Sequence, residues 1–232
     1  MINYNPRLIT NGLVLCLDAA NRKSYPGSGT TWTDLSGNGN TGTLVNGPTY
    51  SSSNGGSLSF DGTNDYVNFG IKFQYQDNFT VECVAKINSA SPSVGPCGSQ
   101  NPIITNKDYG WNLMFTGTTG KPNWGIYNSV SASRSVNSTI GNFGEWVHCV
   151  AYKSGTGIGL YVNGILQGTD TLTSNAVYYY PGYTCTMGGN HPCGNATYYL
   201  NGSVPISRIY NRALSASEIK QNYNATKSRY GL

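Results

Sequence analysis

Three oxygen-bearing side chains lie close enough together in the sequence to bind a metal ion. Asp61, Asn64 and Asp65 stand between two short apolar stretches. Ca²⁺ takes about six to eight oxygen ligands from carboxylates, amides and main-chain carbonyls, and a tight turn supplies several of these at once. Only two carboxylates are local here, and Asp and Asn side chains in a hairpin turn also bond to their own backbone. We therefore treat these residues as a candidate calcium site whose alternative is an ordinary turn.

A tyrosine-rich segment in the last quarter of the chain is the second candidate site. Its aromatic and polar members are Tyr178, Tyr179, Tyr180, Tyr183, Asn190 and His191. Tyrosine rings stack on the C–H faces of sugars, and exposed aromatic side chains with a polar rim mark binding surfaces. Tyrosine is also enriched where protein subunits meet. The segment is therefore predicted to contact either a glycan or a partner protein.

The cysteines divide by their sequence surroundings. Three lie inside apolar strand patterns and are expected as buried free thiols, namely Cys16, Cys83 and Cys149. Three others, Cys97, Cys185 and Cys193, lie among glycines and prolines. A Cys185–Cys193 disulfide is predicted if the protein matures in an oxidising setting. The alternative is a zinc site on Cys185, His191 and Cys193, for which the sequence offers no fourth ligand.

Paired carboxylates of the kind that catalyse acid–base chemistry are missing from the sequence pattern. The glutamates are Glu82, Glu145 and Glu218, and none has an Asp or Glu two residues away. The chain also lacks a G-x-S-x-G nucleophile motif and a Walker A loop. We predict a protein that is not an enzyme. A glycan-degrading enzyme is the remote alternative, in which carboxylates distant in the sequence converge.

The elements that must position these residues are predicted to be strands. Charged residues make up only 10% of the chain, while it contains 30 glycines and 18 tyrosines. Such a composition disfavours helices and suits short strands joined by many turns. Residues 79–87 alternate with period two, and Asn163-Gly164 between two apolar stretches is a strong hairpin signal.

These patterns predict an all-β fold with two antiparallel sheets packed as a jelly-roll sandwich. We expect a single domain over residues 1–232. Residues 13–17 and 204–210 are expected as edge strands, where another chain can pair.

One short helix is predicted at the C-terminus, over about residues 216–226. Ser215 is a favourable N-cap and Glu218 completes a capping box, while Leu214 and Ile219 form a hydrophobic staple. The helix is expected to dock on the sandwich.

Charge and hydropathy exclude several functions. The net charge is +4, but no run of Lys or Arg reaches three residues, so nucleic-acid binding is not expected. The first residues do not form a secretory signal. No stretch approaches the roughly 20 apolar residues that span a bilayer, so we expect synthesis in a cytoplasm and no membrane insertion.

Several stretches together carry a family resemblance. Residues 58–67 read L-S-F-D-G-T-N-D-Y-V, residues 79–82 read F-T-V-E, and residues 146–148 read W-V-H. Residues 160–164 follow as L-Y-V-N-G, and the last stretch covers residues 202–219. In this order they resemble the laminin-G-like jelly-roll family, a branch of the concanavalin-A-like lectin/glucanase superfamily. The resemblance implies a jelly roll and, in some relatives, a calcium site near residues 61–65.

The two ends of the chain carry a narrower resemblance. Residues 12–21, 25–32 and 34–39, together with residues 222–232, are similar to stand-alone virion proteins of tailed phages. This resemblance implies a protein that is made in the host cytoplasm and displayed on the virion. Its partners would be other capsid or tail proteins, and it would be oligomeric on the particle.

Two functional hypotheses follow. In the first, the chain is a structural decoration or accessory protein of a phage capsid or tail. The absence of coiled-coil heptads, a repetitive shaft and a separate anchoring domain favours this hypothesis. In the second, it is a carbohydrate-binding adhesin that recognises a host surface glycan.

Overall fold

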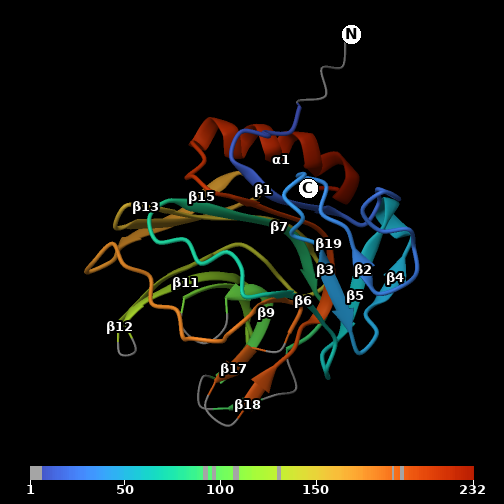
Figure 1. The fold of residues 1–232 in the computed structure, drawn as a ribbon, viewed down its shortest axis with the longest axis horizontal. Coiled ribbons are helices and arrows are strands. Elements are labelled where there is room, and N and C mark those ends of the chain that lie inside the picture. Colours follow the sequence, from blue (N-terminus) through green and yellow to red (C-terminus); the bar gives the residue numbers. More distant parts are fainter. Residues whose placement is uncertain are drawn as a thin grey trace.

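Two antiparallel sheets face each other across an apolar core, and one helix lies on the outer face of one sheet (Figure 1). The computed structural model describes residues 7–90, 94–95, 98–106, 110–129, 132–189, 191–193 and 196–232. The predicted all-β jelly-roll sandwich with one C-terminal helix is confirmed. Within these residues, no helix is long and apolar enough to cross a membrane.

The first sheet, called sheet I, carries the helix on its outer face. Its strand order is β15-β14-β13-β7-β19-β5-β4, with β1 paired to β19. The strands are β1 (Leu13–Asp18), β4 (Thr49–Ser51), β5 (Ser57–Asp61), β7 (Phe79–Ile87), β13 (Trp146–Ser154), β14 (Gly157–Val162), β15 (Ile165–Thr171) and β19 (Asn201–Tyr210). A short 3-10 turn, η1 (Ser53–Gly55), lies between β4 and β5.

The second sheet, sheet II, has the order β12-β11-β10-β9-β16-β6-β3-β2, with β8 paired to β9. Its strands are β2 (Thr31–Trp32), β3 (Gly42–Val45), β6 (Tyr66–Gly70), β8 (Val94–Gly95), β9 (Gly98–Asn106), β10 (Trp111–Thr116), β11 (Pro122–Ser129), β12 (Ala132–Asn137) and β16 (Cys185–Met187). A separate hairpin consists of β17 (His191–Cys193) and β18 (Ala196–Tyr198).

Strand alternation directs aromatic side chains into the space between the sheets. Successive side chains of a strand point to opposite faces, so Trp111 of β10 and Trp124 of β11 enter the core and meet Phe79 of β7. The ring centroids of these three residues are 5.9–6.0 Å apart. The residues that alternate with these core residues along β10 and β11 therefore point to the outer face of sheet II. Most of these outward side chains are polar.

The hairpin predicted at Asn163-Gly164 is present between β14 and β15. Both turn residues have positive φ, 54° for Asn163 and 73° for Gly164, as a type I′ turn requires.

The prediction that residues 204–210 form an edge strand is wrong, because β19 pairs with β7, β5 and β1. The outer side of β1 is itself occupied. Asn40 Nδ2 and Ser36 Oγ donate hydrogen bonds to the Val14 carbonyl at 2.7 and 3.0 Å.

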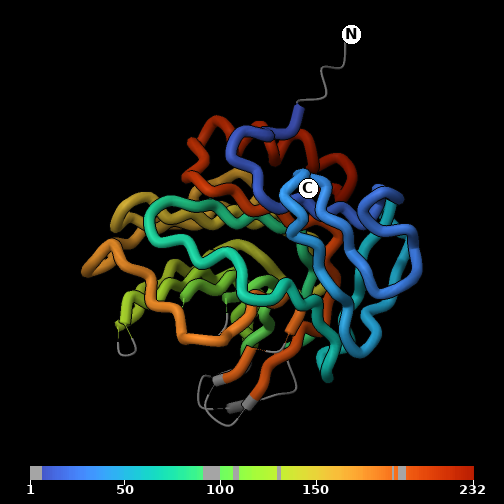
Figure 2. Tube along the Cα trace, viewed as in Figure 1, coloured from blue at the N-terminus to red at the C-terminus, as the bar shows by residue number. Residues whose placement is uncertain are grey.

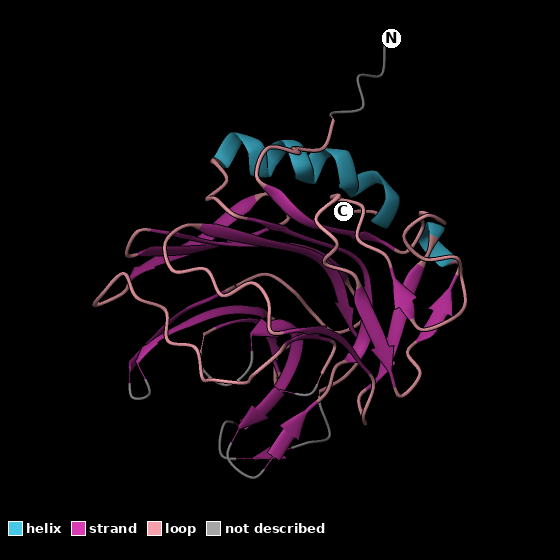
Figure 3. Cartoon of the chain, viewed as in Figure 1, coloured by secondary structure: helices cyan, strands magenta, loops and turns pink. Residues whose placement is uncertain are grey.

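The helix α1 (Ala216–Tyr230) crosses the outer face of sheet I (Figure 3). The predicted capping box is confirmed, since the Ser215 side chain accepts from the Glu218 amide and the Glu218 side chain accepts from the Ser215 amide. The helix continues four residues beyond the predicted end. It stops only at Gly231, which is left-handed with φ 68° and donates its amide to the Lys227 carbonyl, an arrangement typical of helix C-termini.

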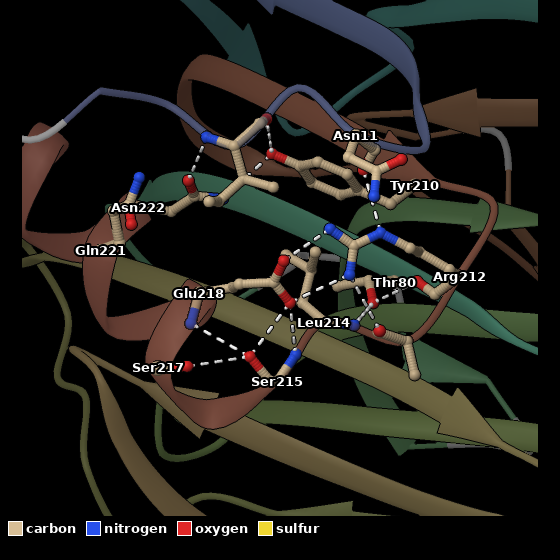
Figure 4. A network of polar contacts seen from close by, with 12 residues as sticks. Asn11, Thr80, Tyr210, Arg212, Leu214, Ser215, Ser217, Glu218, Gln221 and Asn222 are labelled. Carbon is tan, nitrogen blue, oxygen red and sulfur yellow. Dashed lines mark hydrogen bonds and ion pairs between the residues drawn. The ribbon is translucent and has the colours of Figure 1, made fainter.

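The start of the helix is tied to the N-terminal segment and to sheet I (Figure 4). Arg212 Nη2 lies 2.6 Å from Glu218 Oε1, and Arg212 Nε donates to the Asn11 carbonyl at 3.0 Å. Thr80 Oγ1 of β7 accepts the Leu214 amide at 2.9 Å. The helix is therefore docked by polar contacts in addition to the apolar staple.

Candidate functional site

A polar pocket of about 140 Å³ opens on the outer face of sheet II, the face that α1 does not cover. Its lining comes from four neighbouring strands, β9 to β12. The lining residues are Gln100, Asn112, Met114, Asn123, Gly125, Tyr127, Ser133, Arg134 and Ser135. We call this the sheet II pocket.

Strand register brings these residues together. Trp111 and Leu113 face the core, so Asn112 must point outward. Asn112 pairs with Gly125 and Met114 pairs with Asn123 across β10 and β11. Residues paired in this way lie side by side on one face of the sheet, which assembles the pocket floor from residues distant in the sequence.

The Asn112 side chain is the central polar group of the floor. It is only 7% exposed. Within the described part of the chain, its side-chain carboxamide forms no hydrogen bond. A Cβ on Gly125 would lie 2.6 Å from Asn112 Oδ1, so glycine at this position makes room for the amide. An amide offers two donors and one acceptor group, and leaving these unbonded when buried is costly. Asn112 is therefore suited to bind a polar ligand.

The predicted tyrosine segment adjoins this pocket. Residues 172–184, orange in Figure 2, cross from sheet I to sheet II. The Tyr178 amide donates to the carbonyl of Tyr127, a pocket residue, at 2.9 Å. Tyr180 is 44% exposed and stacks on Tyr183, with ring centroids 4.9 Å apart. A stacked tyrosine pair, in which Tyr180 is exposed and Tyr183 is half-buried, thus lies on the same segment that contacts the pocket wall.

Not every tyrosine of the segment faces solvent. Tyr179 packs against the core, and its hydroxyl donates to the Tyr75 carbonyl at 2.7 Å. Burial, reinforced by Cys185, raises the pKa of Tyr179 well above its usual range. Tyr179 therefore holds the segment on the sandwich. His191 is 4% exposed and lies on the separate β17–β18 hairpin, while Asn190 is outside the described residues.

A buried lysine anchors the beginning of the tyrosine segment. Lys153 of β13 is fully buried. Its Nζ donates to Asn175 Oδ1 at 2.6 Å and to the main-chain carbonyls of Gln76, Asp77 and Gly155 at 2.7–2.9 Å. Burial lowers the pKa of Lys153. The ammonium thus ties three loops together at one end of the sandwich.

The residues of the predicted calcium site form a self-bonded turn. Asp61 Oδ1 accepts the Thr63 amide at 2.8 Å, and Asp65 Oδ2 accepts the Asp61 amide at 3.2 Å. The Asn64 carbonyl accepts from Asn46. Burial, with the nearby charge of Asp61, raises the pKa of Asp65. The turn alternative accounts for these contacts, and among the described residues no three His, Cys, Asp or Glu side chains converge on a metal site.

The predicted Cys185–Cys193 disulfide is absent. Cys185 is a free thiol with no exposed surface, because its position in β16 turns it into the core between the sheets. Burial raises the pKa of Cys185 well above its usual value, so it is a neutral thiol and a poor zinc ligand. The side chain of Cys193 is outside the described residues. Cys16, Cys83 and Cys149 are buried free thiols, as predicted.

The three glutamates occupy three separate settings. Glu145 is bonded to Asn142 near the surface, and Glu218 is used by the helix cap. Glu82 is fully buried between sheet I and α1. It accepts from His148 Nε2 at 2.9 Å, from Arg208 Nη1, and from Asn222 Nδ2 of the helix at 2.7 Å.

The geometry of the Glu82 cluster is that of a structural network and not that of a catalytic site. Burial by itself would raise the pKa of Glu82, but Arg208, with the bonds from His148 and Asn222, lowers that pKa to about 2. A carboxylate held ionised and without exposed surface cannot reach a substrate. No local sequence pattern predicts this cluster, because Arg208 meets Glu82 only through the pairing of β19 with β7.

Comparison with known proteins gives a family and a fold. A family model described as "Concanavalin A-like lectin/glucanases superfamily" matches residues 61–220, more than half of the chain. No curated protein sequence matches.

The fold recurs in solved toxin binding domains. That of Paraclostridial Mosquitocidal Protein 1 has a TM-score of 0.70 at 15% identity, over 93% of this chain and 52% of that structure. The botulinum neurotoxin serotype D binding domain has a TM-score of 0.65 at 16% identity, over 93% and 52%. A structure titled for the dependence of botulinum neurotoxin type C cell entry on two ganglioside molecules has a TM-score of 0.68 at 13% identity, over 94% and 52%. This chain therefore spans about half the length of these structures, and the likeness shows a shared fold.

Proposed function

Because the chain belongs to the concanavalin A-like lectin/glucanases superfamily, we propose that it is a carbohydrate-binding recognition module that takes its ligand in the sheet II pocket. The observation that carries this proposal is the buried Asn112 amide, which faces the pocket without a hydrogen-bond partner in the described part of the chain. Sugar hydroxyls both donate and accept hydrogen bonds, and a carboxamide matches both roles.

The rest of the pocket lining supports the same ligand class. Tyr127 and Met114 supply an aromatic and an apolar surface, while Gln100, Asn123 and two serines supply polar groups. Small-molecule sites commonly combine apolar walls with a few placed polar groups. No carboxylate occurs among the described lining residues, whereas most glycosidases use two. This favours binding over hydrolysis.

The neighbouring structures support a recognition role. Their titles describe binding domains, and one names gangliosides as molecules on which toxin entry depends. In this chain the stacked Tyr180–Tyr183 pair would add an aromatic contact beside the pocket. A glycan longer than one sugar would then bridge the pocket and the tyrosine segment.

Replacing Gly125 by Ala tests the pocket without touching a ligand-binding group. The new Cβ would displace the Asn112 amide, whose Oδ1 lies 2.6 Å from that position. We expect affinity for a glycan identified on an array to fall by about tenfold or more, the loss that one or two hydrogen bonds predict. Isothermal titration calorimetry of the wild type and the variant measures the change.

Two further variants make the result interpretable. Asn112→Ala should lose a similar amount of affinity. Gly157→Ala is the matched control on sheet I, because its Cβ would meet nothing closer than 3.3 Å, and it should bind like the wild type. Unchanged affinity in both pocket variants, with glycan binding intact, would place the site elsewhere on the molecule.

The setting in which this module acts is a further part of the proposal. The resemblance of residues 12–39 and 222–232 to tailed-phage virion proteins supports a module displayed on a capsid or tail. Cryo-EM of purified particles tests this: density for the chain on the particle is expected, with the sheet II pocket open to solvent. Absence of the chain from the particle, or burial of the pocket against a capsid lattice, would contradict the proposal that the chain is an adhesin displayed on the virion.

A further inference from the structure

We propose that the sheet II pocket binds the acetamido group of an N-acetylated amino sugar, such as an N-acetylhexosamine residue of a glycan. This inference rests on the proposed function and narrows the ligand to one class of sugar. Three observations carry it: the absence of charge on the pocket face of the described lining, the depth of the two floor residues, and the apolar side chain beside Asn112.

The pocket face of sheet II presents uncharged side chains among the described lining residues. In β12, Ser133 and Ser135 flank Arg134, which pairs with the core residue Ile126 of β11. The Arg134 side chain therefore leaves β12 on the face opposite the pocket, while both serines lie on the pocket face. The described lining thus suits a neutral ligand group.

The two side chains at the pocket floor are nearly closed off from solvent. Asn112 is 7% exposed and Met114 is 5% exposed, because both alternate along β10 with residues that face the core. A sugar ring that rests on the rim would touch little of either side chain. A small substituent that projects from the ring can reach both, and a pocket of about 140 Å³ has room for it.

The floor matches an amide that ends in a methyl group. Asn112 has an unpartnered carboxamide in the described part of the chain, and its Nδ2 can donate to the acetamido oxygen. Met114 lies two residues further along the strand, at a separation of about 7 Å, and its thioether offers the methyl group an apolar contact.

A hydroxyl group in the same place would use the floor less well. It could bond to Asn112, but beside Met114 it would lose water without gaining a hydrogen-bond partner. An acetamido group uses both floor residues, and sites of this kind discriminate against an analogue that leaves a buried polar group unpaired. The pocket should therefore prefer an N-acetylated sugar to the parent sugar.

Matched sugar pairs test this inference on the intact chain. The pairs are N-acetylglucosamine and glucose, N-acetylgalactosamine and galactose, and chitotriose and cellotriose. In isothermal titration calorimetry, the N-acetylated member of at least one pair should bind about tenfold or more tightly, the gain from one hydrogen bond and one buried methyl group. In saturation-transfer NMR, its acetamido methyl protons should receive the strongest signal from the protein.

Two variants assign the preference to the pocket floor. Met114→Ser removes the apolar contact and should reduce the difference within a pair about threefold or more, with little change for the parent sugar. Gly125→Ala displaces the Asn112 amide and should reduce the difference as well. Ile71→Ala is the matched control, because Ile71 is 60% exposed and lies outside the pocket lining, and it should keep the wild-type preference. Circular dichroism checks that each variant is folded.

The possible failures are distinguishable. Equal binding to both members of every pair, lost on Asn112→Ala, would overturn the acetamido ligand and leave the sheet II pocket as the sugar site. A preference for the N-acetylated sugar that neither Met114→Ser nor Gly125→Ala reduces would place the acetamido contact elsewhere and also overturn it. Absence of binding to any glycan on a broad array would remove both proposals.

Discussion

Replacing Glu82 by Gln is expected to lower the free energy of unfolding by about 3–5 kcal/mol, the usual cost of breaking a buried ion pair from one side. The substitution removes the negative charge that compensates Arg208 while keeping the size of the side chain. Arg208 is buried, and its Nε already lacks a hydrogen-bond partner, so its guanidinium would keep few compensating contacts.

The same substitution should loosen helix α1. Asn222 of the helix donates to Glu82 Oε2 at 2.7 Å and to the Tyr210 hydroxyl at 2.9 Å. It also accepts the Ile9 amide at 3.0 Å. The helix, the N-terminal segment and sheet I therefore share one hydrogen-bond network, and such networks respond as a unit to loss of a member.

Urea unfolding followed by circular dichroism measures the effect. Glu218→Gln is the matched control, because it breaks the partly exposed Arg212–Glu218 pair and should cost about 1 kcal/mol. The double variant Glu82→Gln/Arg208→Met should be less destabilised than the two single variants added together. A loss below about 1 kcal/mol for Glu82→Gln would mean that the cluster does not hold the fold.

The dependence of the protein's stability on pH is also expected to follow from Glu82. The pKa of Glu82 is lowered to about 2 in the folded protein, against about 4.3 in an unfolded chain. Its ionised form therefore stabilises the fold fully above pH of about 4.3, and this contribution is lost as the pH falls towards 2. Glu218 titrates in the same range, so Glu82→Gln should flatten the acid limb of the stability curve in part.

Replacing Lys153 by Met is expected to have the second large effect. We expect the free energy of unfolding to fall by about 2–4 kcal/mol. Methionine fills most of the space of the lysine stem but donates no hydrogen bond. Three main-chain carbonyls and the Asn175 side chain would lose their shared donor. The loops that they belong to would then separate more readily.

Hydrogen exchange locates this second effect. Faster exchange is expected in residues 172–178, which Lys153 holds through Asn175, with little change in β7 or β19. Lys121→Met removes an equal charge outside these contacts and should change stability by no more than about 0.5 kcal/mol. Uniformly faster exchange across both sheets would show that Lys153 supports the whole sandwich instead of the tyrosine segment.

Turn chemistry and strand periodicity were sufficient to predict much of the fold. Asn163-Gly164 specifies its hairpin because both residues tolerate positive φ. Ser215 and Glu218 specify where the helix starts, since the capping box is formed by neighbours in the chain. The end of the helix was less predictable, because Gly231 as a cap is recognised only when the helix actually reaches it.

The composition of the candidate site could not be predicted from the sequence in the same way, because it depends on contacts between segments that are distant in the chain. Asp61, Asn64 and Asp65 resemble metal ligands in sequence, but the backbone amides around them already bond to the two carboxylates. Among the tyrosines, sequence alone does not separate Tyr179, which packs on the core, from Tyr180, which faces solvent. That difference arises from the path of the segment between the two sheets.

Sequence by itself determined the all-β class, the position of one hairpin and the start of the helix, because each depends on residues a few positions apart. Tertiary structure alone decided that Asn112 lies beside Gly125, that Ser135 borders the same pocket, and that Cys185 points into the core. Strand register controls these placements, since a shift by one residue turns every side chain to the opposite face. Register in turn is chosen by burial of the whole core, which no local pattern contains.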